Sequence, residues 1–338
     1  MGVLAVGYTI VLFAGFFAPY EFDKQNRQLV LAPPTSIHFV DSKGQFHARP
    51  FVYGWMLRTG TFNEYEQHRS QPHFIRFFVL GAQYTILGSV TSRLHLFGTD
   101  QETPIFLIGS DEYGRDQLSR LLYGGRISLF AGVLASAIAV GFGLLLGGLA
   151  GYYGHIIDEV IMRATEVFLT MPWLYLLLIV RAALPLRTSP EETFLLLIMI
   201  LGVIGWARPA RLIRGVVLVA KSQEYILAAR GFGATDIYLL RIHILPQISS
   251  VAVTQALLFI PQYILAEVTL SFFGLGISEP VPSWGNMLAG LQSYFVLRSC
   301  WWMCAPAVAL VIVLFAYHRI LLFPARGSGI EIRPASKP

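Results

Sequence analysis

One acidic residue, Glu267, lies inside an apolar stretch that covers residues 248–275. A carboxylate in a membrane-spanning helix is energetically costly and is often functional, so Glu267 could carry a proton or bind a cation in a solute pathway. The alternative is a carboxyl group that hydrogen-bonds to a neighbouring helix or faces an aqueous path. A second polar pair, Arg163 and Glu166, is spaced three residues apart, which allows an ion pair on one helix face.

The motifs of the common ATP-binding and hydrolytic enzymes are missing from the sequence. No G-x-x-x-x-G-K-[ST] run is present, so we do not expect a P-loop, and neither H-E-x-x-H nor G-x-S-x-G occurs. Cys300 and Cys304 are one helical turn apart in an apolar stretch without His or acidic neighbours. We expect these thiols to pack in the interior rather than to bind a metal or form a disulfide. We therefore predict no catalytic residue, no metal and no cofactor in this chain.

The composition indicates a membrane protein. Of the 338 residues, 55% are hydrophobic and 13% are charged, and the mean hydropathy is +0.59. A soluble domain carries about 25% charged residues. The net charge of +5 comes from Lys and Arg clustered in a few loops. No basic patch alternates with exposed aromatic residues, so we do not expect nucleic-acid binding.

Six apolar runs approach the length of about 20 residues that spans a bilayer. They cover residues 3–19, 127–152, 160–184, 193–206, 248–275 and 301–323. The connection 207–246 is rich in Lys and Arg, which predicts a cytoplasmic position. Counting helices outward from it puts residues 20–108 and 276–299 outside and both termini inside. We predict an all-α polytopic membrane protein with a first transmembrane helix at 1–19, an amphipathic outer segment at 109–126, a transmembrane domain at 127–323 and a cytoplasmic tail at 324–338.

Residues 20–108 form no spanning run, because charged residues, His, Pro and aromatic residues are mixed there. The stretch 74–90 is apolar and β-branched around Gly81, which predicts a pair of strands. We expect a small extracytoplasmic insertion of mixed or β character. In the second apolar run, Gly143, Gly147 and Gly151 recur every four residues. Such a stripe lets a second helix approach closely.

The basic connection contains a segment, residues 224–246, that predicts two short helices joined by a turn. Gly233 suits the left-handed residue that ends the first helix. Thr235 can cap the second helix, and Asp236 favours its positive end. Pro246 is expected to stop the second helix before the next span. Such an elbow is suited to seat a soluble partner, although an ordinary connecting loop would show the same pattern.

This elbow resembles the EAA loop of binding-protein-dependent ABC importer permeases, which reads EAA, three residues, Gly, nine residues, then I-x-L-P. The matching positions are Ala228, Ala229, Gly233, Leu245 and Pro246. Leu227 stands where the signature has Glu, and His243 replaces the first Ile. The resemblance implies an ATPase-docking loop at 224–246, whose candidate residues also include Glu224 and Ala234.

Further stretches resemble the C-type permease of dipeptide and oligopeptide importers. They cover residues 109–116, 118–129, 205–206 together with 211–215, 265–276 and 282–287. In the outer stretches the candidate residues are Asp111, Gly114, Arg115, Asp116, Trp284 and Asn286. We expect Arg115 and Asp116 to hold the outer segment together. Trp284, Trp301 and Trp302 fit an interfacial aromatic belt.

The resemblance implies the type I ABC importer permease fold in a bacterial-type cytoplasmic (inner) membrane. It also implies a homologous B-type permease, two ABC ATPases that bind ATP and Mg²⁺, an extracytoplasmic binding protein and a peptide substrate. Residues 20–108 are expected to contact the binding protein or the sister permease. Because ATP drives transport in such systems, we favour the structural interpretation of Glu267. The alternatives are import of nickel or another small solute, and a stand-alone secondary transporter or channel with Glu267 as its ion site.

Overall fold

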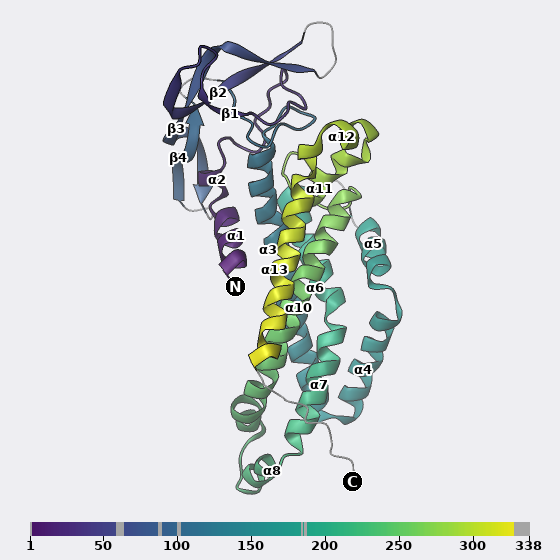
Figure 1. Ribbon diagram of the computed structural model, residues 1–338. Helices are drawn as coiled ribbons and strands as arrows, with labels where there is room; N and C mark the ends of the chain where they lie inside the picture. Colours follow the sequence, from purple (N-terminus) through teal and green to yellow (C-terminus); the bar gives the residue numbers. More distant parts are fainter. Residues whose placement is uncertain are drawn as a thin grey trace, which may run out of the picture.

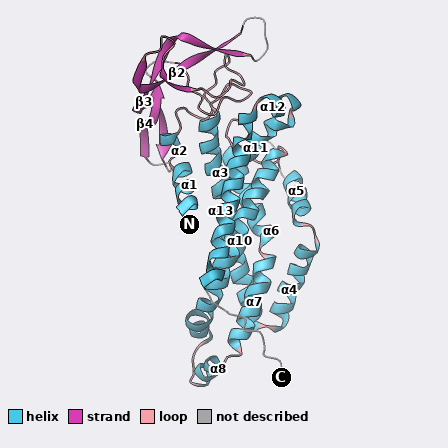
Figure 2. Cartoon of the chain, in the orientation of Figure 1, coloured by secondary structure: helices cyan, strands magenta, loops and turns pink. Residues whose placement is uncertain are grey.

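The strands of the chain gather at one end of a long helical bundle. The computed structural model describes residues 2–58, 64–86, 90–99, 103–183, 185 and 188–327. Helices form the bundle, and the strands lie together beyond one end of it (Figures 1 and 2). We call this the insertion end and the opposite end, where α8 (Glu224–Gly231) lies, the elbow end. The 276–299 segment also lies at the insertion end, with α11 (Trp284–Ala289) and α12 (Tyr294–Ser299).

Among the residues that the structure describes, three helices are long and apolar enough to cross a membrane. They are α3 (Gln117–Tyr153), the continuous helix 236–272 that contains α10 (Leu245–Phe272), and the helix 301–321 that includes most of α13 (Ala305–Gly327). Two bent helix pairs raise the number to five at most among the described residues, compared with the six predicted. Residues 324–327 continue α13, and the rest of the predicted tail lies outside the described residues.

The first predicted span is shorter than expected. Residues 3–19 form α1 (Gly2–Leu12) and the four-residue α2 (Ala14–Phe17). Eleven helical residues rise about 16 Å, about half of the hydrocarbon core of a bilayer. In Figure 1, α1 accordingly begins partway along the bundle instead of at the elbow end.

The predicted span 160–184 is broken. It forms α4 (His155–Thr170) and α5 (Trp173–Ala183), which meet at 92°. Pro172 causes the break, because the residue before a proline is pushed out of the helical region, and Met171 is extended with ψ 137°. Arg181, which the sequence analysis missed, then holds α5: its Nε donates to Leu275 O at 2.6 Å.

The predicted connection 207–246 is largely helical. The span expected at 193–206 is α6 (Pro190–Gly205), and α7 (Ala207–Lys221) follows it at an angle of 43°. The glycine stripe of α3 lies against α7, as the spacing predicted. A Cβ on Gly147 would lie 2.3 Å from Ala210 O, and one on Gly143 would lie 2.7 Å from Pro209 Cβ. The main core lies between α3, α6 and α10, where small residues such as Ala135 face Leu201 and Tyr263.

The insertion is a four-stranded antiparallel sheet in the order β1-β2-β3-β4. The strands are Ile37–Val40, Phe46–Leu57, Tyr65–Ile86 and Val90–Thr99. The predicted strand pair around Gly81 is wrong in detail, because residues 74–86 all belong to β3. Gly81 makes room for the His95 ring of β4, which would lie 2.6 Å from an added Cβ. His95 Nδ1 lies 2.7 Å from Ala18 O, so the same ring joins the sheet to the end of α2.

Candidate functional site

The elbow contains the turn that the sequence predicted. Gly233 has φ +87°, in the left-handed region that favours glycine. The N–H of Ala234 donates to Ala229 O at 3.1 Å, which closes the end of α8. The Thr235 hydroxyl oxygen accepts from the N–H of Tyr238 at 3.4 Å and caps α9 (Asp236–Tyr238). Both capping predictions are confirmed.

The prediction that Pro246 stops the second helix is wrong. From Asp236 to Phe272 the chain is one helix, in which residues 239–244 form a π-helical turn and Pro246 lies in the first turn of α10. A proline inside a helix removes one backbone hydrogen bond and crowds the preceding turn, and here the preceding turn is the π-helical one, whose hydrogen-bond pattern differs from that of an α-helix. The second helix of the elbow is therefore continuous with a spanning helix.

The elbow has a packed inner face and an exposed apolar outer face. Ile226, Leu239 and Ile244 are buried against α7. On the outer face, Leu227 is 56% exposed, Ile237 77% and Phe232 93%. Of the candidate docking residues, Glu224, Ala228, Gly233, Leu245 and Pro246 are exposed, whereas Ala229, Ala234 and His243 are half-buried. Leu227, where the signature has Glu, thus adds apolar surface to the outer face.

A polar contact joins the elbow to the end of α3. The Tyr152 hydroxyl hydrogen-bonds to the Asp236 carboxylate and accepts from Arg230 Nη2 at 3.1 Å. Arg230 also pairs with Asp236 at 3.2 Å. Lys221 Nζ donates to the carbonyl of Tyr152 at 2.5 Å. Tyr152 was not predicted as a functional residue; it lies last but one in α3, 84 residues before Asp236.

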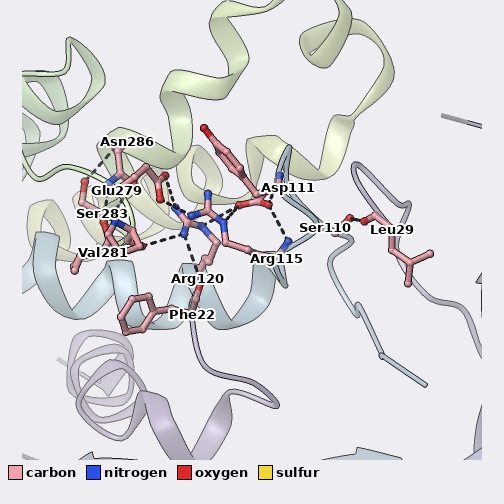
Figure 3. Close-up of polar contacts among 12 residues, drawn as sticks. Phe22, Leu29, Ser110, Asp111, Arg115, Arg120, Glu279, Val281, Ser283 and Asn286 are labelled. Carbon is pink, nitrogen blue, oxygen red and sulfur yellow. Dashed lines mark hydrogen bonds and ion pairs between the residues drawn. The ribbon is translucent and has the colours of Figure 1, made fainter. Parts of the chain in front are cut away.

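At the insertion end, four charged side chains form a cluster in which three are buried and the fourth, Glu279, is 41% exposed (Figure 3). Arg115 Nε lies 2.7 Å from Asp111 Oδ2, and Arg115 Nη1 lies 2.5 Å from Glu279 Oε2. Arg120, whose side chain is 1% exposed, lies 3.3 Å from Asp111 and 2.8 Å from Glu279. We call these four residues the outer clamp. The ion pairs keep the pKa of Arg115 above its usual value although burial opposes this.

The outer clamp also holds backbone from two other segments. Arg120 Nη1 donates to Phe22 O at 3.5 Å and to Pro280 O at 3.4 Å. Gly114, with φ +72°, lets the segment lie against Asn26, since a Cβ there would be 1.9 Å from Asn26 O. Of these residues Arg115 was predicted from the sequence, whereas Arg120 and Glu279 were not. The second arginine, five residues after the first, was the available signal.

Asp116 caps α3 instead of joining the clamp. Its Oδ2 accepts from the N–H of Ser119 at 2.7 Å and from the Ser119 hydroxyl at 2.6 Å. Burial raises the pKa of Asp116 to about 7, and the two hydrogen bonds from Ser119 oppose this rise.

Two of the three tryptophans expected in an interfacial belt are internal. Trp284 is 3% exposed and donates from Nε1 to Leu121 O at 3.0 Å, and Trp302 is 6% exposed and donates to Ser110 O at 3.0 Å. Only Trp301 of the three is exposed. The ring N–H groups of Trp284 and Trp302 donate to protein carbonyls. Because these hydrogen bonds replace those that water would supply at the membrane interface, both rings can be buried. Asn286 Nδ2 donates to Val281 O at 2.9 Å and shapes the same loop.

The remaining polar candidates, Glu267, Arg163 and Glu166, belong neither to the elbow nor to the outer clamp. Glu267 is fully buried, and its Oε1 accepts from the Ser271 hydroxyl at 2.7 Å. The Ser128 and Ser283 hydroxyls also lie beside this carboxyl group. Arg163 and Glu166 form the expected pair at 3.4 Å, and Glu166 also contacts Arg211 at 3.6 Å, with all three side chains exposed. Within the described residues, no group of three or more His, Cys, Asp or Glu is placed to hold a metal ion.

These features define a helical membrane protein with a helical elbow at one end and a clamped, sheet-bearing segment at the other. A family model for the binding-protein-dependent transport system inner membrane component matches residues 143–322. This match includes the elbow and covers more than half of the chain. The chain belongs to this family. The resemblance inferred from the motifs, the multi-pass inner-membrane location and the role as a transport component are thereby confirmed.

Individual relatives match over a similar region. The dipeptide transport system permease protein DppC of Bacillus subtilis is 40% identical over 212 residues, which are 62% of this chain and 64% of that protein. The oligopeptide transport system permease protein OppC of Escherichia coli K12 is 39% identical over 213 residues, 63% and 68% of the two chains. The chain thus spans less than two thirds of the Bacillus protein. Among solved structures, a chain of the inward-facing MetNI methionine ABC transporter is similar, with a TM-score of 0.45, 19% identity and coverage of 61% of this chain and 95% of that chain.

Proposed function

We propose that this chain is a permease subunit of an ATP-driven importer of peptides. It forms half of the translocation path with a homologous permease and takes its driving force from two partner ATPases. An extracytoplasmic binding protein delivers the peptide to the insertion end. The family match supports the transport role, and the peptide substrate is supported by relatives that are named as dipeptide and oligopeptide permeases.

The observation that carries this proposal is the geometry of the elbow. Its outer face exposes Leu227, Phe232 and Ile237 far from the bundle core. Large apolar side chains that are exposed together on a segment at one end of a protein are typical of a contact with a partner. The helix that starts at Asp236 continues through the span to Phe272. A partner that moves the elbow would therefore move a spanning helix with it.

ATP hydrolysis by the assembled complex in lipid tests the substrate class. The chain is reconstituted with its sister permease, ATPases and binding protein, and is given di- to oligopeptides or Ni²⁺. Stimulation by particular peptides supports the proposal, and stimulation by Ni²⁺ alone replaces peptide import with metal import. Uptake driven by a proton gradient without ATP, and lost in Glu267→Gln, would establish the secondary transporter instead.

The docking surface is tested separately. Phe232→Asp places a charge at the most exposed apolar side chain of the elbow, so we expect the ATPase subunits to be lost during purification of the complex. Phe295→Asp is the matched control, because Phe295 is 45% exposed at the insertion end. If both variants retain the ATPase subunits, the proposal that these subunits bind the elbow is wrong.

A further inference from the structure

A cavity of about 910 Å³ opens at the insertion end, and its size falls within the range of small-molecule pockets, about 300–1,000 Å³. Its walls come from Leu12 at the end of α1, from α3, from the first turns of α6, from the 277–282 loop, and from two pieces of the N-terminal region at residues 21–23 and 83–85. The family match begins at residue 143, so the α3 residues that line the cavity and both N-terminal pieces lie outside it.

The lining combines an apolar wall with unpaired charges. Phe130 and Phe194 belong to the wall, and the charged members are Glu21, Asp23, Arg126 and Glu191. Within the described part of the chain, these four side chains make no hydrogen bond or ion pair. The neighbouring outer clamp differs, since its four charged side chains satisfy one another. Three carboxylates against one guanidinium give the lining a formal charge of about −2 at neutral pH.

The lining residues are held in place by contacts with one another, with the outer clamp and with β4. Arg120 of the outer clamp binds the backbone of Phe22, and the Phe22 ring packs edge-on against Tyr123 at 5.3 Å. The Tyr84 hydroxyl donates to Leu94 O at 2.7 Å, which fixes that side chain to β4. Arg120 also binds Pro280 O beside Val281, another lining residue. The cavity is thus formed before any ligand arrives, which lowers the entropy cost of binding.

We propose that this cavity binds a small solute that carries both an ammonium group and a carboxylate, as an unmodified short peptide does. The inference rests on the proposed import of peptides and assigns them a subsite at the insertion end. The carboxylates of Glu21, Asp23 and Glu191 attract the ammonium group. The Arg126 guanidinium matches the geometry of a carboxylate, and the apolar wall receives the peptide side chains.

The test uses the assembled transporter without binding protein or ATP, in nanodiscs of phosphatidylcholine and phosphatidylglycerol. Binding of Ala-Ala is compared with that of N-acetyl-Ala-Ala, which lacks the ammonium, and Ala-Ala amide, which lacks the carboxylate. Because a charge-assisted hydrogen bond is lost in each case, we expect each capped peptide to bind about tenfold more weakly or worse. Arg126→Gln is expected to weaken Ala-Ala to the same extent and to leave Ala-Ala amide unchanged.

The matched variant for the other end of the ligand is Glu191→Gln, which is expected to weaken Ala-Ala and spare the acetylated peptide. Arg298→Gln, an exposed arginine in α12 outside the cavity, is the control and is expected to change nothing. Equal affinities for the three peptides, or equal losses in Arg126→Gln and Arg298→Gln, overturn the subsite. A further measurement adds phosphatidylethanolamine to the nanodiscs. If the cavity binds this lipid but no peptide, the proposed peptide subsite is also overturned.

Uptake separates this inference from the function on which it rests. ATP-driven peptide uptake that is normal in both wild type and Arg126→Gln refutes the subsite and leaves the importer intact. Absence of ATP-driven peptide uptake in the wild-type complex refutes the importer itself.

Discussion

Arg120 Nη2 lies 2.8 Å from Glu279 Oε1, although 159 residues separate the two in the chain. This ion pair fastens the loop that follows α10 to the first turn of α3. The loop and the helix end thereby behave as one unit at the insertion end. The same arginine reaches the backbone at Phe22, so the N-terminal region joins this unit.

Glu279→Gln is expected to destabilise the protein, since it removes one of the two carboxylates that pair with the buried Arg115 and Arg120. A buried charge that loses a partner costs about 1–3 kcal/mol, which thermal unfolding in detergent or nanodiscs detects. Glu66→Gln is the control, because the Glu66–Arg58 pair is more than half exposed, and such pairs contribute about 1 kcal/mol or less. Equal losses in the two variants would show that the clamp adds no stability.

Gly147→Ala is expected to push α3 away from α7, because the added Cβ would lie 2.3 Å from Ala210 O. Overpacking of this kind costs about 1–3 kcal/mol. Gly148 is the matched control, since a Cβ on it meets nothing within 4 Å. Gly148→Ala is expected to leave stability unchanged or to raise it by up to about 1 kcal/mol through helix propensity. Thermal unfolding of the two variants measures the difference. A higher unfolding midpoint for Gly147→Ala than for Gly148→Ala would contradict the close approach of α3 and α7.

Gly233→Val tests the turn of the elbow, because a β-branched residue strains a backbone at φ +87°. A strain of about 1–2 kcal/mol lowers the population of the native turn by about 5–30-fold. We expect peptide-stimulated ATP hydrolysis to fall while membrane insertion stays normal. Gly231→Val is the control. At both positions an added Cβ meets nothing within 4 Å, but the φ of Gly231 is not positive, so we expect ATP hydrolysis to be kept in this variant. Normal hydrolysis in Gly233→Val would refute the proposed role of the turn.

Asp116 predicts a pH dependence of stability. Its pKa rises from an ordinary 3.8 to about 7 on folding, so the folded protein binds more protons than the unfolded chain between these values. Stability from this group is therefore full below about pH 4 and is lost as the pH rises towards 7. Asp116→Asn removes this loss while an amide oxygen keeps the cap.

Thermal unfolding of both proteins at pH 5 and pH 8 measures the effect. We expect Asp116→Asn to gain stability over wild type at the higher pH. A difference between the two proteins that is the same at both values would show that Asp116 titrates at its ordinary pKa in the folded state.

Tyr152→Phe removes the hydroxyl that joins α3 to Asp236 and Arg230 of the elbow. We expect a loss of about 1 kcal/mol at this contact, and a lower ratio of peptide imported to ATP hydrolysed, because the elbow would move without α3. Tyr153→Phe is the control, since Tyr153 is the next residue and its side chain is 49% exposed. An unchanged transport ratio in Tyr152→Phe means that α3 is not driven through this contact.

The sequence by itself determined the features that depend on neighbouring residues. The elbow, its left-handed Gly233 and the Thr235 cap follow from local backbone chemistry, and the glycine stripe follows from the helical period. The apolar runs and the family motifs also depend only on composition and order. The Pro172 break belongs to the same class, although only the structure made its 92° angle evident.

Only the tertiary structure decided which distant residues meet. Glu279 lies in a loop with no periodic pattern, so nothing in the sequence pairs it with Arg120. We predicted a turn between two strands at Gly81, but glycine occurs both in turns and where another group approaches closely. At Gly81 the reason is close approach, because the His95 ring packs against it. Trp284 and Trp302 became internal because carbonyls from other segments could accept their N–H groups. Such partners are supplied by packing between segments that are remote in the chain, and no local pattern records them.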